Sequence, residues 1–277
     1  MIKVIEEGAV LVDSGPLYAT ITVSQNGCPL SGAAIDGAQY ALKLLEQLAN
    51  FLAVIKKKAS ALKLEDSYPQ VVREMISAVQ AINDPELTPL AAVAGATSDL
   101  VADYLLNTKA TKIMVNNGGD IAIRLREEGE IRVGLCLNLA SREIDYFLPV
   151  GSDCGICTSG VGGRSFTLGI ASAVVTLADR ASVADAAATY LGNKTNVDSD
   201  KVKREWAEII YPDTDIPGKK VTISVGALSR AEIQQALESG QREALKLINT
   251  GVIHGALLAV KDNLLPLGVF KGKMRQL

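Results

Sequence analysis

The sequence predicts an α+β fold in which mainly antiparallel sheets pack against helices. Strands and helices occur in separate blocks along the chain, and tight turns join neighbouring strands within a block. Composition points the same way: 48% of the 277 residues are apolar but only 4% are aromatic, so small aliphatic residues must form a closely packed core. We expect one compact domain over residues 1–277, in which a repeated hairpin-then-helices order indicates two similar intertwined halves at about 1–110 and 111–277.

Strands are predicted where apolar and polar residues alternate or where β-branched residues gather between turn signals. In chain order these segments are 2–5, 8–12, 17–24, 112–116, 121–126, 131–139, 145–150, 173–177, 221–225, 252–260 and 265–270. Asn26-Gly27 is typical of a hairpin turn, and a second hairpin is expected around Asp262-Asn263. The chain therefore starts with a β-meander, and no glycine-rich loop leads from its first strand into a helix.

Helices are predicted where apolar residues recur at helical spacing. They are expected over 36–63 and 69–82, from Thr88-Pro89 onward, from Ser182 onward, and over 229–247. Thr88 and Pro89 have the order of an N-cap and a first helical residue, and Ser229 with Glu232 forms a capping-box pattern. Residues 90–98 are almost all small, which favours either close helix packing or a nearby flat ligand.

The net charge, the apolar pattern, the single histidine and the cysteines each argue against a class of protein. A net charge of −3 gives no reason to expect a nucleic-acid partner. The chain has no signal-like start and no long uncharged apolar window, so we expect a cytoplasmic protein without a membrane partner. The single histidine, His254, argues against a Ser-His-Asp hydrolase. Cys154 and Cys157 form an isolated C-x-x-C, which we interpret as two buried thiols rather than a metal or redox site.

Three motifs of small residues indicate a binding site. They are Val115-Asn116-Asn117-Gly118-Gly119-Asp120, Cys157-Thr158-Ser159-Gly160 followed by Gly162-Gly163, and Ala184-Asp185-Ala186-Ala187-Ala188-Thr189. Glycines beside hydroxyls and a carboxylate allow the backbone to approach a phosphate closely. Asp185 and Thr189, four residues apart on a helix, share a face and offer two hard oxygens to a divalent cation. Together the motifs predict a small-molecule nucleotide bound with a cation.

Each motif also has a purely structural interpretation. Ser182 and Asp185 have the spacing of a capping box, so Asp185 is either a helix cap or a ligand. The segment from Asn117 to Asp120 is either a tight turn or part of the site. Arg164 follows the glycine-rich stretch and either meets a phosphate or is a surface arginine.

At these motifs the sequence resembles the ApbE-like superfamily, the FAD:protein FMN transferases, and more closely a short uncharacterised branch found in bacteria and archaea. The family's N-x-GGD turn matches Asn116 to Asp120, its T-S-G matches Thr158 to Gly160, and its A-D-x-x-x-T helix matches Ala184 to Thr189. A weaker match to the family's I-A-K-G lies at Val93-Ala94-Gly95. The motifs cover roughly residues 88–195, and the outer thirds match only in the order of their elements.

The resemblance implies a fold of duplicated T-fold-like halves that binds FAD. It also implies Mg²⁺ held by Asp185, Thr189 and the backbone carbonyl of Ala94, beside the pyrophosphate. The residues expected to line the nucleotide are Asn117, Gly118, Gly119, Asp120, Thr158, Ser159, Gly160 and Arg164. Members of the family then pass FMN to a threonine of an acceptor protein.

Two departures from the family pattern bear on activity. The interval from Arg164 to Ala173 lacks the family's H-x-x-D-P-x-T-G segment, and Gly95 stands where the family has lysine. Three hypotheses follow: a nucleotide-binding protein that takes FAD or a related nucleotide with Mg²⁺, an active FMN transferase whose acceptor is unknown, and a non-catalytic homo-oligomeric scaffold. In the third hypothesis the alanine-rich surface of residues 88–106 would be the subunit contact.

Overall fold

The computed structural model describes residues 1–137, 144 and 146–276, and these form two compact units. Unit 1 comprises residues 1–131, 150–157 and 178–185, and the rest of the described chain belongs to unit 2. Both units therefore collect segments that are far apart in the sequence. The prediction of one domain with intertwined halves stays a prediction.

Unit 1 contains an antiparallel sheet in the order β1-β2-β3-β5-β6-β9, with the short β4 paired to β3. Its strands are β1 (Ile2–Glu6), β2 (Ala9–Ser14), β3 (Leu17–Gln25), β4 (Cys28–Pro29), β5 (Lys112–Asn117), β6 (Asp120–Leu125) and β9 (Cys154–Ser159), of which the first four residues of β9 belong to this unit. Ile21 pairs with Val115, and Val115 pairs with Ala122, so the buried positions of adjacent strands lie side by side.

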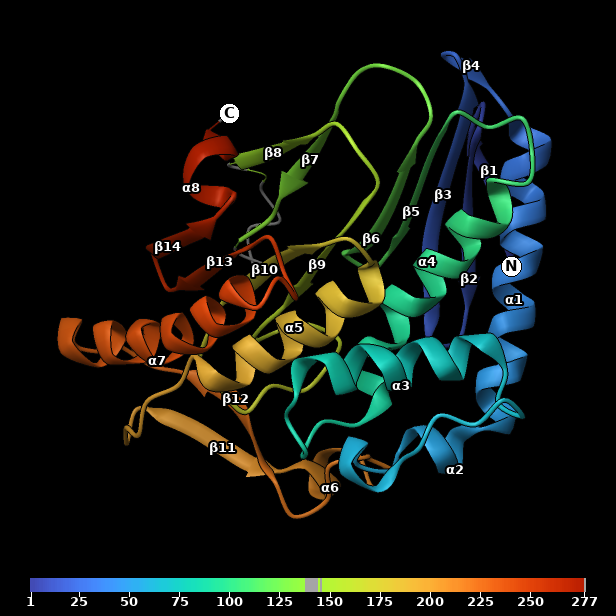
Figure 1. Cartoon of the computed structure of the whole chain (residues 1–277). Helices are drawn as coiled ribbons and strands as arrows, with labels where there is room; N and C mark the ends of the chain where they lie inside the picture. The colour runs from blue at the N-terminus through green and yellow to red at the C-terminus, as the bar shows by residue number, and fades with distance from the viewer. Residues whose placement is uncertain (138–143, 145, 277) are drawn as a thin grey trace. The chain divides into compact units, whose positions relative to one another are not determined.

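Helices cover one face of this sheet, as Figure 1 shows. The helices of this unit are α1 (Ser31–Asn50), α2 (Leu52–Ile55), η1 (Ala59–Ala61), α3 (Gln70–Ile82), η2 (Pro89–Ala92) and α4 (Val93–Leu105). The first helix packs on β2 and β3, α4 packs on β5 and β6, and α3 packs against both helices. Because Gly95, Ala96 and Ser98 are small and buried, α4 can approach its neighbours closely.

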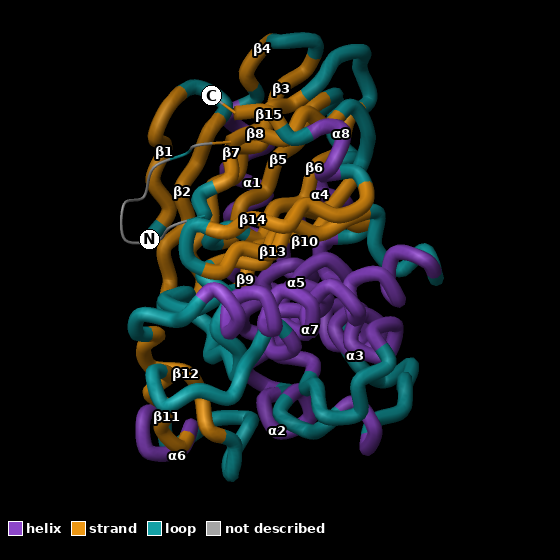
Figure 2. Tube along the Cα trace, turned by 90° about the vertical axis from the view of Figure 1, so that its left-hand side faces the viewer, coloured by secondary structure: helices purple, strands orange, loops and turns teal. Residues whose placement is uncertain are grey.

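Unit 2 is built around the antiparallel order β10-β13-β14, with α7 packed on β13 and β14. Its remaining strands form the orders β15-β8-β7 and β11-β12. The elements are β7 (Ile131–Leu135), β8 (Tyr146–Val150), β10 (Ala173–Ala178), α5 (Ala181–Lys194), β11 (Val202–Trp206), α6 (Ala207–Ile210), β12 (Lys220–Val225), α7 (Arg230–Asn249), β13 (Gly255–Val260), β14 (Asn263–Gly268), α8 (Phe270–Lys273) and β15 (Arg275–Gln276). Helix α5 starts in unit 1 and continues into unit 2, where its second half lies beside α7 (Figure 2).

The predicted α+β class with mainly antiparallel sheets is confirmed. The helix predicted over 36–63 is wrong at both ends, because α1 begins at Ser31 and Phe51 leaves helical geometry. The helix expected from Pro89 is a short 3₁₀ turn, η2, followed by α4 from Val93, and the Thr88 side chain makes no capping bond. The ends of two predicted strands, at Leu139 and Asp145, lie outside the described residues.

Several elements were not predicted. Strand β9 (Cys154–Ser159) escaped because its Cys-Gly-Ile-Cys-Thr-Ser sequence has no alternation, and it is instead buried at four consecutive positions. The short elements β4, β11, α6, α8 and β15 also lacked a periodic signal. In the described part of the chain, no helix is both long and apolar enough to span a bilayer.

Candidate functional site

The candidate site in unit 1 begins where the first turn of α5 meets the first turn of α4. A Cβ atom on Gly95 would lie 2.8 Å from the Asp185 Cβ and closer still to the Ala181 carbonyl, so only glycine fits there. The Gly95 backbone N–H donates a hydrogen bond to Oδ2 of Asp185, with an N–O distance of 2.9 Å. The close crossing thus fixes one carboxylate oxygen of Asp185, which is 8% exposed.

Asp120 is the second carboxylate at this place, and it is 9% exposed. It is the first residue of β6, and its backbone carbonyl accepts a hydrogen bond of 2.8 Å from the Ser98 hydroxyl on α4. Burial raises the pKa of the Cys157 thiol well above its ordinary value, and the negative charges of Asp120 and Asp185 raise it further. The charges of both carboxylates therefore act on one buried thiol, whose Sγ donates to the Ala181 carbonyl at 3.2 Å.

The two glycines before Asp120 form a tight turn between β5 and β6. Gly118 and Gly119 have positive φ angles of 68° and 107°, which side chains rarely adopt. The side-chain oxygen of Asn116 accepts a hydrogen bond of 2.8 Å from the Gly119 N–H. The turn explains why glycine is needed at both positions, and the nucleotide role of Asn117, Gly118, Gly119 and Asp120 stays a prediction.

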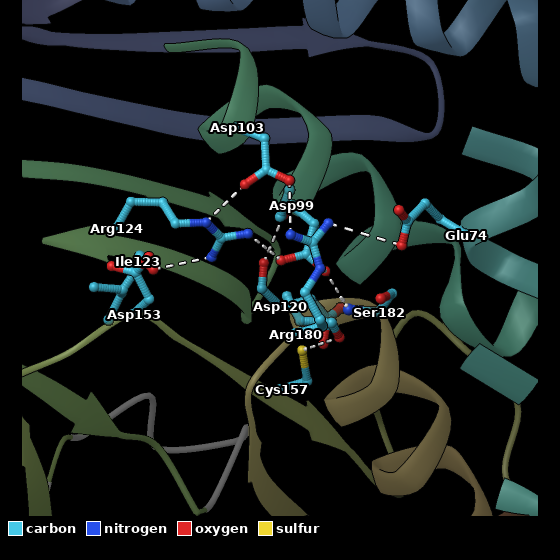
Figure 3. A network of polar contacts seen from close by, with 12 residues as sticks. Glu74, Asp99, Asp103, Asp120, Ile123, Arg124, Asp153, Cys157, Arg180 and Ser182 are labelled. Carbon is cyan, nitrogen blue, oxygen red and sulfur yellow. Dashed lines mark hydrogen bonds and ion pairs between the residues drawn. The ribbon is translucent and has the colours of Figure 1, made fainter. Parts of the chain in front are cut away.

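A partly buried network of ion pairs supports the start of α5 (Figure 3). The carboxylate of Asp99, which is 0% exposed, accepts hydrogen bonds of 2.8 Å from the Arg124 guanidinium and 2.8 Å from the backbone N–H of Ser182. Asp103 accepts at 2.7 Å from both Arg124 and Arg180. The Arg180 Nε also lies 3.4 Å from the Asp99 carboxylate, so the network joins α4, β6 and the first turn of α5.

The local charges affect ionisation within this network. Burial lowers the pKa of Arg124, but the neighbouring Asp99 and Asp103 carboxylates outweigh it and raise that pKa overall, so the guanidinium stays charged. Burial raises the pKa of the Glu74 carboxyl, which lies 3.7 Å from Arg180. The surroundings of Glu74 therefore favour protonation of its carboxyl.

The T-S-G motif lies in unit 2. Thr158 and Ser159 are the last residues of β9 and are part-buried. A Cβ on Gly160 would lie 2.5 Å from the Ser172 carbonyl, which accounts for the glycine by close backbone contact. The Val161 N–H donates to the Ala171 carbonyl at 2.9 Å and closes the loop between them, on which Arg164 is exposed.

The same loop is held against the second half of α5 by side-chain contacts. The Leu168 N–H donates to the Asn193 side chain at 2.9 Å. A Cβ on Gly192 would lie 3.7 Å from the hydroxyl oxygens of both Ser159 and Thr167, so both hydroxyls face that glycine. The segment in which the family carries H-x-x-D-P therefore packs here through Thr167 and Leu168.

The available donors fit Mg²⁺ in their chemistry. Asp185 and Thr189 lie one turn apart on α5 and offer carboxylate and hydroxyl oxygens. Ala94 lies in the first turn of α4, where helical bonding directs its carbonyl along the helix axis, so a metal would have to use its second lone pair. The described residues contain no group of three or more His, Cys, Asp or Glu suited to a metal. A cation held by one or two carboxylates with ligand phosphates needs no such group.

The structure places the predicted site residues in two sets. Ala94, Asn117, Gly118, Gly119, Asp120 and Asp185 belong to unit 1, whereas Thr158, Ser159, Gly160, Arg164 and Thr189 belong to unit 2. The network residues Asp99, Asp103, Arg124 and Arg180 were not predicted from the sequence. One signal was present: Arg124 is a charged residue inside an apolar strand, and a buried arginine needs acidic partners. The interpretation of Cys154 and Cys157 as buried free thiols is confirmed.

Comparisons with known proteins identify a matching family model and relatives that are similar in sequence. A family model described as "AbpE bacteria" matches residues 4–275. A UPF0280 protein of Methanococcus vannielii is 30% identical over 214 residues, which cover 73% of this chain and 85% of the relative. A UPF0280 protein of Methanosarcina barkeri is 36% identical over 147 residues, and the match spans only 56% of that relative's length.

Solved structures share the fold. The apo form of the flavinyl transferase ApbE of Pseudomonas stutzeri has a TM-score of 0.53 at 13% identity, covering 99% of this chain and 100% of that protein. The flavin transferase ApbE of Vibrio cholerae has a TM-score of 0.55 at 14% identity, covering 97% and 99%. At such low identity, these likenesses establish the fold alone.

Proposed function

The chain belongs to the ApbE-like family, and on this premise we propose that it binds FAD or a related nucleotide together with Mg²⁺. The observation that carries the proposal is the pair of nearly buried carboxylates, Asp120 and Asp185, beside the buried thiol of Cys157. Carboxylate oxygens are ligands that Mg²⁺ prefers, and the Gly95 N–H already orients one oxygen of Asp185. A divalent cation bound with a diphosphate would use such an oriented carboxylate.

Asp185 is the residue proposed to bind the metal, with Thr189 as a further ligand one turn along α5. One Asp185 oxygen already accepts the Gly95 N–H, so its carboxylate would bind the metal in a fixed orientation. The metal would neutralise charge on the diphosphate. The turn at Gly118-Gly119 would bring backbone groups close to the nucleotide.

The replacement of the family's lysine by Gly95 also supports binding rather than transfer. Because α5 fills the space beside Gly95, no lysine side chain could start from this backbone position. The family's H-x-x-D-P segment is absent as well. Transfer of FMN to an acceptor protein is therefore the alternative, and the proposal does not include it. Covalent flavin and AMP, formed on incubation with FAD, Mg²⁺ and candidate acceptors, would establish it.

The test is FAD binding with and without Mg²⁺, measured by flavin fluorescence on purified wild-type protein and on Asp185→Ala. We expect a flavin affinity that rises with Mg²⁺ and an Asp185→Ala protein in which this rise is lost. Asp66→Ala is the matched control, because the Asp66 side chain is exposed and lies 4.0 Å from the Arg73 guanidinium. A folded wild-type protein indifferent to FAD, FMN, NAD and ATP at all Mg²⁺ concentrations would contradict the proposal and favour a non-catalytic scaffold.

A further inference from the structure

We propose that Asp99 is a positioning residue that fixes the Asp185 carboxylate by clamping the first turn of α5 to α4. The expected change in metal affinity rests on the proposed function, but the contacts that support the inference all lie within unit 1. Asp99 would contact neither metal nor nucleotide. It would act through the helix that carries Asp185.

The clamp has two points of contact between the same two helices. Gly95 N–H donates to the Asp185 carboxylate at 2.9 Å, and Ser182 N–H donates to Oδ2 of Asp99 at 2.8 Å. Gly95 and Asp99 are four residues apart on α4, and Ser182 and Asp185 are three apart on α5, so each pair lies on one helix face. Two such contacts prevent α5 from rotating about its axis or sliding along α4.

The network behind Asp99 holds the clamp rigid. Its Oδ1 accepts from Arg124 on β6 at 2.8 Å, and Arg124 is 3% exposed. Arg124 and Arg180 both bind Asp103, one turn further along α4, so the two arginines are held from two directions (Figure 3). The Asp99 carboxylate therefore has little freedom to follow a shift of Ser182.

Stability alone does not account for this arrangement. Burying Asp99 and Arg124 removes both charges from water, and buried ion pairs are often no more stabilising than well-packed apolar residues of similar volume. An anionic acceptor at the start of a helix does give a specific benefit, because it pairs with a backbone N–H that has no partner inside the helix. The effect of this hydrogen bond is to fix the position of the first turn of α5 relative to α4.

The test is Mn²⁺ affinity, by electron paramagnetic resonance, together with amide hydrogen exchange in residues 181–185. Asp99→Asn should lower Mn²⁺ affinity by about 10- to 100-fold, as loss of a group that orients a metal ligand commonly does. It should also speed exchange in residues 181–185, while flavin affinity without metal stays unchanged.

Asp153→Asn is the matched control. Asp153 accepts from a backbone N–H, that of Leu125, at 2.8 Å and pairs with Arg126 at 2.7 Å, but its ion pair is exposed. The same substitution there should leave both readouts at wild-type values. If Asp99→Asn does not fold, Arg180→Gln takes its place, because Arg180 is partly exposed and its Nε lies 3.4 Å from the Asp99 carboxylate.

Two results would overturn the proposal. One is a folded Asp99→Asn or Arg180→Gln protein with wild-type exchange in residues 181–185. The other is unchanged Mn²⁺ affinity in these variants while Asp185→Ala abolishes it. If Asp185→Ala itself leaves Mn²⁺ affinity unchanged, the metal site of the proposed function fails, and exchange in residues 181–185 alone decides whether Asp99 holds the helix.

Discussion

At the scale of single residues, Gly95 decides how closely α5 can approach α4. Its missing side chain leaves room for the backbone of Ala181 and the Cβ of Asp185. The contact is with backbone and with the stem of a side chain, neither of which can move aside without shifting the helix. One glycine therefore controls both the helix crossing and the position of the proposed metal ligand.

Gly95→Ala should consequently destabilise the protein, although alanine is the better helix former. We expect a loss of about 1–3 kcal/mol in the free energy of unfolding, the usual cost of overpacking a tight core. Urea denaturation followed by circular dichroism measures this loss. Gly32→Ala on α1 is the control: a Cβ there meets nothing within 4 Å, so it should be neutral or stabilising by up to about 1 kcal/mol. Equal effects of the two substitutions would show that α5 is not held at Gly95.

The residues that sequence analysis found and those it missed differ in a physical way. Asp120 and Asp185 stood out because glycine or alanine surrounds them, and such surroundings are visible along the chain. Asp99, which follows the small residues 90–98, was not predicted because its partners, Arg124 and Ser182, are 25 and 83 residues away. Burial and pairing of that kind are set by packing between elements, which local spacing does not record.

At the scale of elements, α5 and α7 begin in opposite ways. Helix α7 has a capping box of its own, as predicted: Ser229 accepts from the Glu232 N–H and Glu232 accepts from the Ser229 N–H. Helix α5 instead receives an acceptor for its Ser182 N–H from Asp99 on another helix. A local cap can be read from four residues, whereas the cap supplied by Asp99 depends on the packing of α4 and α5.

Glu232 should make the stability of unit 2 depend on acid pH. Hydrogen bonds from Ser199, from Ser229 and from Lys201 lower the pKa of its carboxyl from 4.5 to about 2. The folded state then binds fewer protons than the unfolded state between these values, so the contribution is present above 4.5 and is lost as pH falls toward 2. Urea titrations should show Glu232→Gln less stable than wild type at pH 7, with the difference shrinking below pH 4.5. Glu238→Gln, exposed on the same helix, is the control, and a pH-independent difference would contradict this account.

At the scale of the whole molecule, the antiparallel sheets explain why the fold class was predictable and the grouping of segments was not. Hairpins such as β2–β3, β5–β6 and β13–β14 join neighbours in sequence, and their turns carry local signals. The pairing of β6 with β9 joins residues about 30 positions apart, and no turn sequence indicates this pairing. Non-local pairing of this kind is chosen by the burial of strand faces, which a single sequence shows only weakly.

Unit 1 should therefore not fold from its first segment alone. A fragment of residues 1–131 keeps α1 to α4 and β1 to β6 but loses residues 150–157 and 178–185. Strand β6, whose residues are buried from Asp120 to Arg124, would then have an open edge, and Asp99 would lose the Ser182 N–H. We expect this fragment to aggregate or to unfold without a cooperative transition, as seen by size-exclusion chromatography and thermal circular dichroism. A fragment of residues 1–194 contains every segment of unit 1, so it should recover protection from hydrogen exchange along β6. A monomeric fragment of residues 1–131 with a sharp transition would show instead that β9 and the start of α5 dock onto a sheet that is already complete.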